Sequence, residues 1–305
     1  MALLLLAAQW RETAAPPIAV ATVDHGLRAE AAVEARQVGE WARARGFTHH
    51  ILTHSGAPPR TRVQERARAL RYDLLRDCAE KTGADTIVTA HHADDQAETI
   101  LFRLTRGSGV AGLAGMAEMS RLGALRLFRP LLGVPKADLI ALCENHAQPF
   151  ITDPSNLNES FARPRLRRLG PQLAALGLDR EALLRLGMRA ARAEAALGAV
   201  AAQASQDIGW RDIGWLDGGT DVSALASMPE EIALRILAGI IAAAGGGAVR
   251  LERVESLCEA LLTALRARAP VSSTLAGLLV RLTADGALTL TREGVRRRGR
   301  ALSAG

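Results

Sequence analysis

Two adjacent histidines and three carboxylates cluster directly after a short apolar run. His91, Asp95 and Glu98 lie in the segment HHADDQAE, which follows the β-branched run 86–89. Such a run is typical of a buried strand, and ligands of open α/β sheets bind at the carboxyl ends of strands. A helix would place His91 and Asp95 on one face, where carboxylates suit Mg²⁺ that takes its other ligands from phosphate and water. The alternative is an acidic helix N-terminus, but capping does not explain the paired histidines.

A glycine-rich segment follows the helix that we expect from about residue 94 to 105. Residues 107–112 match the pattern G-x-G-x-x-G. A dinucleotide fingerprint follows a strand and opens a helix, so we do not interpret this match as a Rossmann cofactor site. We expect a loop that lets a nucleotide or an RNA backbone approach closely, with a helix C-cap as the alternative.

Arginines gather in two other segments. Arg71 lies in a basic helix expected over residues 62–81, and we expect it to point into the site because guanidinium binds phosphate bidentately. The other arginines of that helix are interpreted as a solvated face. Arg163, Arg165 and Arg167 follow a segment with the composition of a turn. Their density suggests contacts to a phosphate backbone, with a charged linker as the alternative.

Strand and helix signals alternate through the first half of the chain, which predicts a parallel sheet built from right-handed βαβ units. The composition then changes to Ala/Leu/Arg-rich helical segments. We expect an α/β domain over residues 1–168 and a smaller α-rich domain over residues 169–305. The expected strands are 18–23, 47–52, 86–89 and 125–128, and the expected later helices are 171–205, 229–243 and 250–267, followed by short strands near 279–291.

The charge and the cysteines favour some classes of protein over others. The formal charge is +6 and the pI about 10.1, which favours a polyanionic partner without identifying it. The three cysteines form no zinc or redox spacing and are interpreted as thiols in a reducing compartment. No apolar run has membrane-spanning length, and the start MALLLLAA lacks a signal-peptide cleavage site, so we expect a cytoplasmic protein that begins with a helix.

Six segments together resemble the tRNA(Ile)-lysidine synthetases, members of the N-type ATP pyrophosphatase superfamily. They span about residues 1 to 170 in the family's order. The resemblance implies an adenine-nucleotide α-hydrolase-like, Rossmann-like domain. The matching segments are VDHGLR at 23–28, ARALRY at 67–72, HHADDQAET at 91–99, RGSGVAGLAGM at 106–116, RPLLGVPKADL at 129–139 and DPSNLNESFARPRLR at 153–167.

The resemblance implies a two-step ligase reaction. Enzymes of this family use ATP to adenylate C2 of the wobble cytidine in a tRNA with a CAU anticodon. The ε-amine of free lysine then displaces AMP to give lysidine, which changes the codon read from AUG to AUA. The implied cofactors are ATP and Mg²⁺, and the implied partners are tRNA(Ile) and free L-lysine. The oligomeric state, monomer or homodimer, stays open.

The resemblance also implies roles for individual residues. His91, Asp95 and Arg71 match family positions that handle the ATP phosphates and Mg²⁺, with Asp95 as the expected metal ligand. Asp24 and His25 match the strand end beside the nucleotide.

For tRNA, the implied contacts are Arg106, Arg163, Arg165 and Arg167. Pro164 stands where the family usually carries Asn, a departure that affects the local tRNA contact.

A larger departure concerns the phosphate-binding loop Ser-Gly-Gly-x-Asp-Ser. In the family this loop and its strand precede a segment like MALLLL, with which the 305-residue sequence begins. We therefore expect a sheet whose first strand is missing, with a gap between that strand's neighbours, and a 305-residue form that does not make lysidine. Two alternatives remain, a tRNA 2-thiolation enzyme and a non-catalytic tRNA-binding relative. The first generally needs paired cysteines or an iron–sulfur cluster, which the cysteine spacing does not provide.

Overall fold

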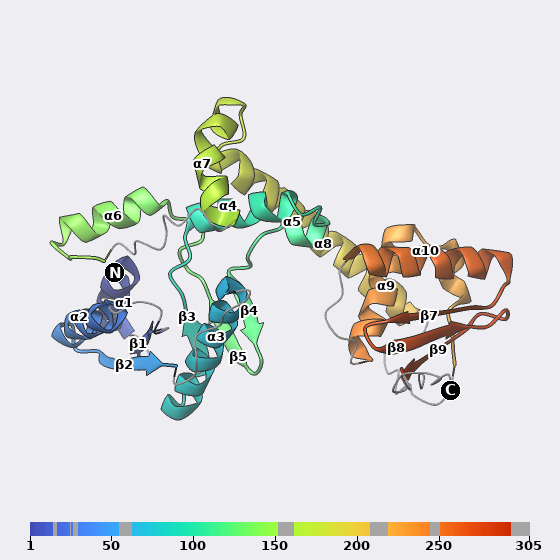
Figure 1. Cartoon of the computed structure of the whole chain (residues 1–305), viewed down its shortest axis with the longest axis horizontal. Helices are drawn as coiled ribbons and strands as arrows, with labels where there is room; N and C mark the ends of the chain where they lie inside the picture. The colour runs from blue at the N-terminus through green and yellow to red at the C-terminus, as the bar shows by residue number, and fades with distance from the viewer. Residues whose placement is uncertain are drawn as a thin grey trace, which may run out of the picture. The chain divides into compact units, whose positions relative to one another are not determined.

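The computed structural model describes residues 1–14, 17–24, 26, 30–54, 63–151, 162–207, 219–244 and 251–293 (Figure 1). The chain divides into two compact units. Unit 1 comprises Met1–Gly107 and Gly112–Met188, and unit 2 comprises Ser108–Ala111 and Arg189–Gly305.

The division lies within helix α8 (Arg180–Asp207), later in the chain than the expected boundary at residues 168/169. The helix α7 (Ala162–Ala175) and the first turns of α8 contribute leucines to one apolar cluster with α4 (Ala93–Leu104). Because these leucines share a core with α4, α7 and the first turns of α8 belong to unit 1.

The strands of unit 1 form two separate sheets. β1 (Ala19–Asp24) pairs in parallel with β2 (Thr48–Thr53). In the other sheet β3 (Thr86–Val88) pairs in parallel with β5 (Leu125–Phe128), which also pairs antiparallel with β4 (Met119–Leu122). The alternating strand and helix order is confirmed, and the sheet is interrupted between β1 and β3, as expected. β4 was not predicted.

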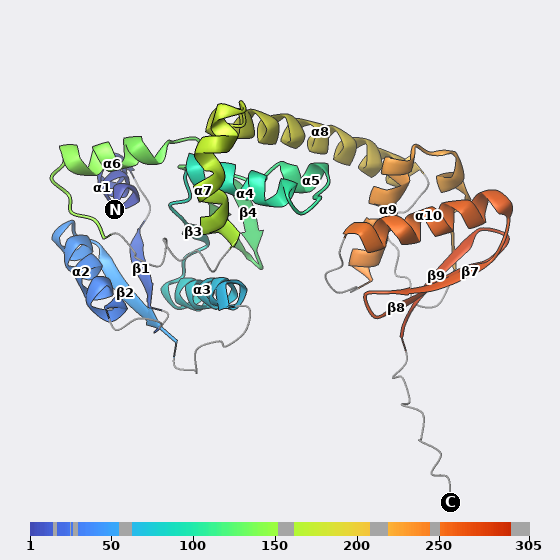
Figure 2. The same cartoon turned by 45° about the horizontal axis from the view of Figure 1, so that its top comes forward.

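Helices cover these strands in unit 1 (Figure 2). α2 (Ala31–Ala44) packs on β1 and β2, and its buried residues share one face. α3 (Val63–Thr82) contacts strands of both sheets, so it bridges the interruption. α1 (Ala2–Ala14) packs against α6 (Lys136–Asn145), and the helix expected at residue 1 is confirmed.

An apolar cluster fixes α3 against the β3–β5 sheet. Tyr72, Leu75 and Ala79 of α3 pack on Ile87 of β3 and Leu127 of β5. Their spacing of three and four residues makes one apolar face of the helix. Burial of that face fixes the rotation of α3 about its axis, and so the directions of its other side chains. The cluster thereby fixes the positions of the α3 arginines, of which Arg68 and Arg71 act on His91 after β3.

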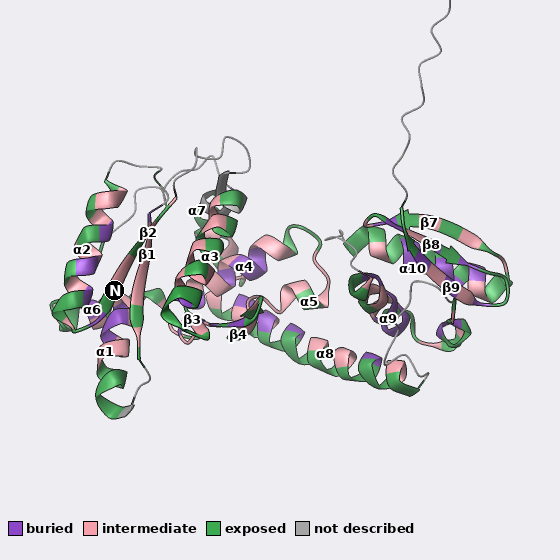
Figure 3. Ribbon diagram, turned by 90° about the horizontal axis from the view of Figure 1, so that it is seen from below, coloured by how far each residue is buried: buried purple, intermediate pink, exposed green. Residues whose placement is uncertain are grey.

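Unit 2 combines helices with an antiparallel sheet. α9 (Glu230–Ala243) and α10 (Leu251–Ala267) confirm the expected helices and contribute buried leucines and isoleucines to one core with the sheet (Figure 3). A short 3₁₀ helix, η2 (Ser223–Ser227), also contacts α10. The strands follow the order β6-β9-β8-β7. Their bounds are β6 Thr220–Asp221, β7 Val271–Leu275, β8 Leu278–Leu282 and β9 Ala287–Arg292.

The remaining short helix is α5 (Val110–Leu113). In the part of the chain that the structure describes, no helix has both the length and the apolar character that a membrane span requires.

Candidate active site at the strand ends

The segment between β3 and α4 places its polar residues at the carboxyl end of the strand. His92 is the N-cap of α4, and its Nδ1 accepts a hydrogen bond from the Asp95 amide at 3.3 Å. The Asp95 carboxylate in turn accepts from the His92 amide at 3.1 Å. This reciprocal capping box satisfies two amides of the first turn, which otherwise have no partner within the helix. The helix therefore begins here and fixes the Asp95 side chain.

His91 is a half-buried imidazole beside several cationic groups. Its Nδ1 lies 2.9 Å from the Thr89 hydroxyl oxygen. The pKa of His91 is lowered to about 4, mainly because burial disfavours the charged imidazole; the nearby Asp95 carboxylate opposes the shift, and the charges of Arg71, Arg68 and Arg129 add to it. The imidazole is therefore neutral at pH 7, and it lies where the charges of three arginines meet the single carboxylate of Asp95, a setting that can accommodate an anion.

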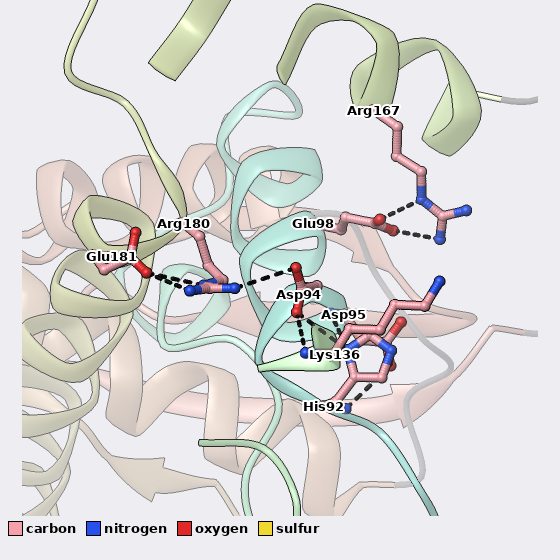
Figure 4. Close-up of polar contacts among 8 residues, drawn as sticks. All are labelled: His92, Asp94, Asp95, Glu98, Lys136, Arg167, Arg180 and Glu181. Carbon is pink, nitrogen blue, oxygen red and sulfur yellow. Dashed lines mark hydrogen bonds and ion pairs between the residues drawn. The ribbon is translucent and has the colours of Figure 1, made fainter. Parts of the chain in front are cut away.

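Asp94 has a structural role at the start of another helix (Figure 4). Its carboxylate accepts a hydrogen bond from the backbone amide of Lys136, the first residue of α6, at 2.8 Å. The other carboxylate oxygen lies 3.6 Å from Nη1 of Arg180, which also binds Glu181. Asp94 therefore bonds to the N-terminus of a neighbouring helix, and its side chain ties α4 to α6 and α8.

Glu98 forms an ion pair with Arg167 of α7. Nη2 of Arg167 donates to Glu98 at 2.9 Å, and Nε donates to the other carboxylate oxygen (Figure 4). The side chain of Glu98 is 20% exposed and that of Arg167 is 41% exposed. The pair is bidentate and connects two elements that are 69 positions apart in sequence.

The carboxylates provide limited capacity for a metal ion. Among the described residues, no group of three or more His, Cys, Asp or Glu side chains could hold one. Asp95 uses one carboxylate oxygen in the capping box, and its second oxygen has no hydrogen bond within the described residues. Mg²⁺ commonly uses one or two protein carboxylates together with phosphates and water, so Asp95 fits that ion as a single ligand.

Asp24 lies at the end of β1, on the first of the two sheets. It is 9% exposed and accepts a hydrogen bond from the Gly26 amide at 2.9 Å. Gly26 has a φ of +63°, a left-handed conformation that this turn requires and that glycine adopts without strain. His25 lies outside the described residues.

The glycine-rich segment after α4 is held by two side chains of that helix. Gly107 has a φ of +66° just beyond the helix end, which agrees with the C-cap alternative. Arg103 donates to the carbonyl oxygens of Gly112 and Gly115 at 2.9 and 2.6 Å. Gln96 exchanges two hydrogen bonds with the backbone of Met116, at 2.8 and 2.9 Å. Residues 112–116 are therefore fixed to α4.

Comparison with known proteins identifies the family. Residues 1–173 match the PP-loop domain family. The protein named tRNA(Ile)-lysidine synthase from Methylobacterium sp. (strain 4-46) is 50% identical over 92% of this chain and 83% of its own length. Its counterpart from Rhodopseudomonas palustris is 45% identical over 93% of this chain and 85% of its own length. The chain belongs to the tRNA(Ile)-lysidine synthase family.

A solved structure supports the fold. The U34-tRNA thiolase NcsA from Methanococcus maripaludis, which carries an iron–sulfur cluster, is 14% identical, with a TM-score of 0.51 over 62% of this chain and 67% of its own. In this lysidine synthase family member all three cysteines are free thiols. Cys78, Cys143 and Cys258 lie on α3, α6 and α10, and Cys143 and Cys258 are buried. This arrangement provides no paired cysteines for the thiolase alternative.

Of the predicted site residues, the structure groups three around the end of β3. Arg71, which is exposed on α3, and Asp95 both act electrostatically on His91. Asp24 lies at the equivalent end of a strand in the other sheet, so the carboxyl ends of β1 and β3 carry the expected residues. Sequence reasoning did not identify Arg129 as part of this environment, although it lies within the matching segment 129–139.

The arginines predicted for tRNA are distributed more widely. Arg106, exposed after α4, lies 4.8 Å over the ring of Phe102. Arg165 is exposed on α7, and Arg167 binds Glu98. The side chain of Arg163 lies outside the described residues. Their contact with tRNA stays a prediction.

Proposed function

We propose that the chain catalyses ATP-dependent formation of lysidine in the CAU anticodon of tRNA(Ile). ATP would adenylate C2 of the wobble cytidine with release of pyrophosphate, and the ε-amine of free lysine would then displace AMP. Family membership and the PP-loop domain support the use of ATP. The observation that carries the proposal is the grouping of His91, the fixed carboxylate of Asp95 and three arginines at the end of β3, a setting suited to a metal-bound polyphosphate such as that of ATP.

The chemistry assigned to each residue follows from its environment. Arg71 is exposed near His91 and offers a planar guanidinium to phosphate oxygens. Neutral His91 serves as a hydrogen-bonding group, because a pKa of about 4 makes it a weak base at pH 7. Asp24 and His25 are assigned to the nucleotide on the family resemblance.

Asp95 is the residue that would hold Mg²⁺ through its unpaired carboxylate oxygen. A bound Mg²⁺ supplies charge neutralisation at the phosphates. The capping box contributes to this role because it fixes the rotamer of Asp95 before any ligand arrives.

The lysine substrate carries two ammonium groups and needs a carboxylate partner. Asp94 and Asp95 are engaged in helix caps, whereas Glu98 already binds a cation, the guanidinium of Arg167. We assign Glu98 to the lysine side of the site. Arg167 would then have to release Glu98 when lysine binds, which would make its guanidinium available to tRNA.

The tRNA partner is assigned to the arginines that the resemblance implies, Arg106, Arg163, Arg165 and Arg167. The exposed guanidinium of Arg165 and the Arg106–Phe102 stack are compatible with backbone contacts. The formal charge of +6 supports a polyanionic partner, and we place the reaction in the cytoplasm.

The test is incorporation of labelled lysine into tRNA(Ile) that carries the CAU anticodon. Arg71→Met should reduce incorporation by about 10²-fold or more, because it removes a bidentate phosphate contact. Arg66→Met is the matched control, since Arg66 is exposed on the same helix and is not among the charges that act on His91.

Equal losses in the Arg71 and Arg66 variants would contradict the assignment of Arg71. Binding of tRNA(Ile) without any lysine incorporation by the unaltered chain would instead indicate the non-catalytic tRNA-binding alternative.

A further inference from the structure

Arg129 is a buried cation without a carboxylate partner among the described residues. It is 7% exposed. Nη1 donates to the Ala117 carbonyl oxygen at 2.7 Å and to the Ser120 hydroxyl at 3.0 Å, and both acceptors are neutral. Nε is buried and has no hydrogen-bond partner in the part of the chain that the structure describes. A buried charge without an opposite charge lowers the stability of the fold, and such charges are found more often at functional sites.

The position of Arg129 places this charge beside the candidate active site. Arg129 directly follows β5, the strand that pairs in parallel with β3. The ladder continues past both strands, because the Thr89 amide donates to the Phe128 carbonyl at 2.9 Å. Thr89 in turn lies 2.9 Å from His91 through its hydroxyl. Arg129 is therefore the neighbour of the Thr89–His91 pair across the sheet.

We propose that Arg129 is a positioning residue that raises the affinity of the strand-end site for a polyphosphate anion without touching it. This inference rests on the proposed function, which places the phosphates of ATP at the same edge. Because Arg129 is 7% exposed and Nη1 already bonds to protein acceptors, we assign the guanidinium a role through its field rather than through a hydrogen bond to the ligand. Low-dielectric surroundings make such a fixed charge more effective than an exposed one.

The lowered pKa of His91 agrees with this assignment. The groups that act on the imidazole are Asp95 of α4, Arg71 and Arg68 of α3, and Arg129 after β5. Arg68 stacks over Tyr72 and is exposed, and Arg71 is exposed as well. Arg129 is the buried member of the three cations, and its effect on the pKa of His91 is smaller than those of Arg71 and Arg68.

The competing explanation is that Arg129 is only a latch for the β4–β5 hairpin. Its backbone amide donates to the Glu118 carbonyl at 2.8 Å, and its side chain bonds to Ala117 and Ser120. A purely structural role depends on these hydrogen bonds, whereas the proposed role depends on the charge. Substitutions that remove the charge and substitutions that remove a hydrogen bond therefore distinguish the two explanations.

The experiment measures binding of inorganic pyrophosphate to the whole chain by calorimetry. Arg129→Met removes the charge at similar length and should weaken pyrophosphate binding about tenfold while the protein stays folded. Arg129→Lys keeps the charge and should restore binding to within about threefold. Ser120→Ala removes one latch contact and should leave binding unchanged. Arg126→Met is the control for net charge, since Arg126 is exposed on β5 and pairs with Asp85.

A second readout is the titration of His91 in the folded protein by NMR, assigned with a His91→Gln variant. Arg129→Met should raise the midpoint of His91, and neither Ser120→Ala nor Arg126→Met should move it. A structural latch would not produce this pattern.

Unchanged pyrophosphate affinity in a folded Arg129→Met protein would overturn the inference. If neither Arg129→Met nor Arg129→Gln folds, Arg129 is a structural residue and the inference also fails. Neither readout needs catalysis. Loss of pyrophosphate binding in Arg129→Met together with absent lysidine formation by the unaltered chain would reject the proposed function and keep this inference.

Discussion

In unit 2, Arg235 donates to both carboxylate oxygens of Glu194 at 2.7 Å each and to Glu231 at 2.8 Å. In unit 1, Arg129 is more completely buried, yet its hydrogen bonds within the described residues go to a carbonyl and a hydroxyl. The difference lies in whether the fold neutralises the charge.

The pairing of Arg235 joins α8 to α9 and contributes to stability, because each partner satisfies the other. The hydrogen bond from Arg235 lowers the pKa of Glu194, which shows that the pair is favourable for the ionised form. In unit 1, the hydrogen bonds of the buried Arg129 within the described residues go to neutral acceptors. We infer that the charge of Arg235 in unit 2 stabilises the fold, whereas the charge of Arg129 in unit 1 raises the electrostatic potential at the candidate active site.

The largest effect on activity without a loss of stability is expected for a substitution at Asp95 of unit 1. Asp95→Asn keeps an oxygen that can accept from the His92 amide, so the capping box and the stability should persist. Loss of the negative charge should reduce ATP–pyrophosphate exchange by about 10²–10³-fold with tRNA binding unaffected. Exchange at the unaltered rate would remove Asp95 from the catalytic set.

The converse effect is expected at Arg235. Arg235→Met leaves the Glu194 and Glu231 carboxylates without their cation and should lower the free energy of unfolding by about 2–3 kcal/mol, less than for a fully buried pair. At a temperature low enough for the Arg235→Met variant to stay folded, its affinity for pyrophosphate should equal that of the unaltered chain. Denaturant titration measures the loss, with Arg253→Met on α10 as an exposed control. A loss of pyrophosphate affinity in Arg235→Met would break the contrast.

A pH effect should distinguish the site in unit 1. The pKa of His91 is lowered from 6.5 to about 4, so below pH 6.5 the unfolded chain takes up a proton that the folded chain does not. Stability should therefore fall as the pH drops from 6.5 towards 4, by about 2 kcal/mol between pH 7.5 and 5. His91→Gln should remove this part of the pH dependence, measured by urea unfolding at both pH values. An unchanged dependence would contradict the lowered pKa.

The smallest effect concerns the arginines assigned to tRNA. Replacing Arg163 and Arg165 with Gln should flatten the slope of log K against log salt by about one to two units for cognate and non-cognate tRNA alike. Adding Arg167→Gln should contribute less, because Arg167 already binds Glu98. Filter binding across a salt series measures the slopes.

The matched control for these arginines replaces Arg185 and Arg192, which are exposed on α8. Equal flattening by the control would indicate general charge. A loss confined to cognate tRNA would indicate base readout.

Local patterns accounted for much of the fold and part of the site. The run 86–89 followed by HHADDQAE predicted a strand that feeds a helix, and the structure adds that His92 and Asp95 form the cap. The expected helix 171–205 is wrong at its start: α7 ends at Ala175, and Gly177 has a φ of +85° between α7 and α8. An Ala/Leu/Arg composition carries no signal for that break except the glycine itself.

The tertiary contacts could not be predicted in the same way. Glu98 and Arg167 are 69 positions apart, and nothing in either segment specifies the other as its partner. The burial of Arg129 depends on the β4–β5 hairpin, and β4 has an alternating exposure pattern too short to stand out in sequence. β7, with the sequence VSSTL, was missed because only two apolar residues mark its ends.

The attachment of residues 112–116 to α4 has a consequence for engineering. A segment with several glycines near a helix end would normally be chosen as a place to insert a tag or a reporter domain. Here Arg103 binds the carbonyls of Gly112 and Gly115, and Gln96 binds both backbone groups of Met116. Tolerance of insertion depends on the hydrogen bonding of the backbone that is interrupted, not on its composition. The turn between β4 and β5, where an added Cβ at Gly123 would have no atom within 4 Å, is the better insertion point if Gly123 itself, with its φ of +62°, is kept.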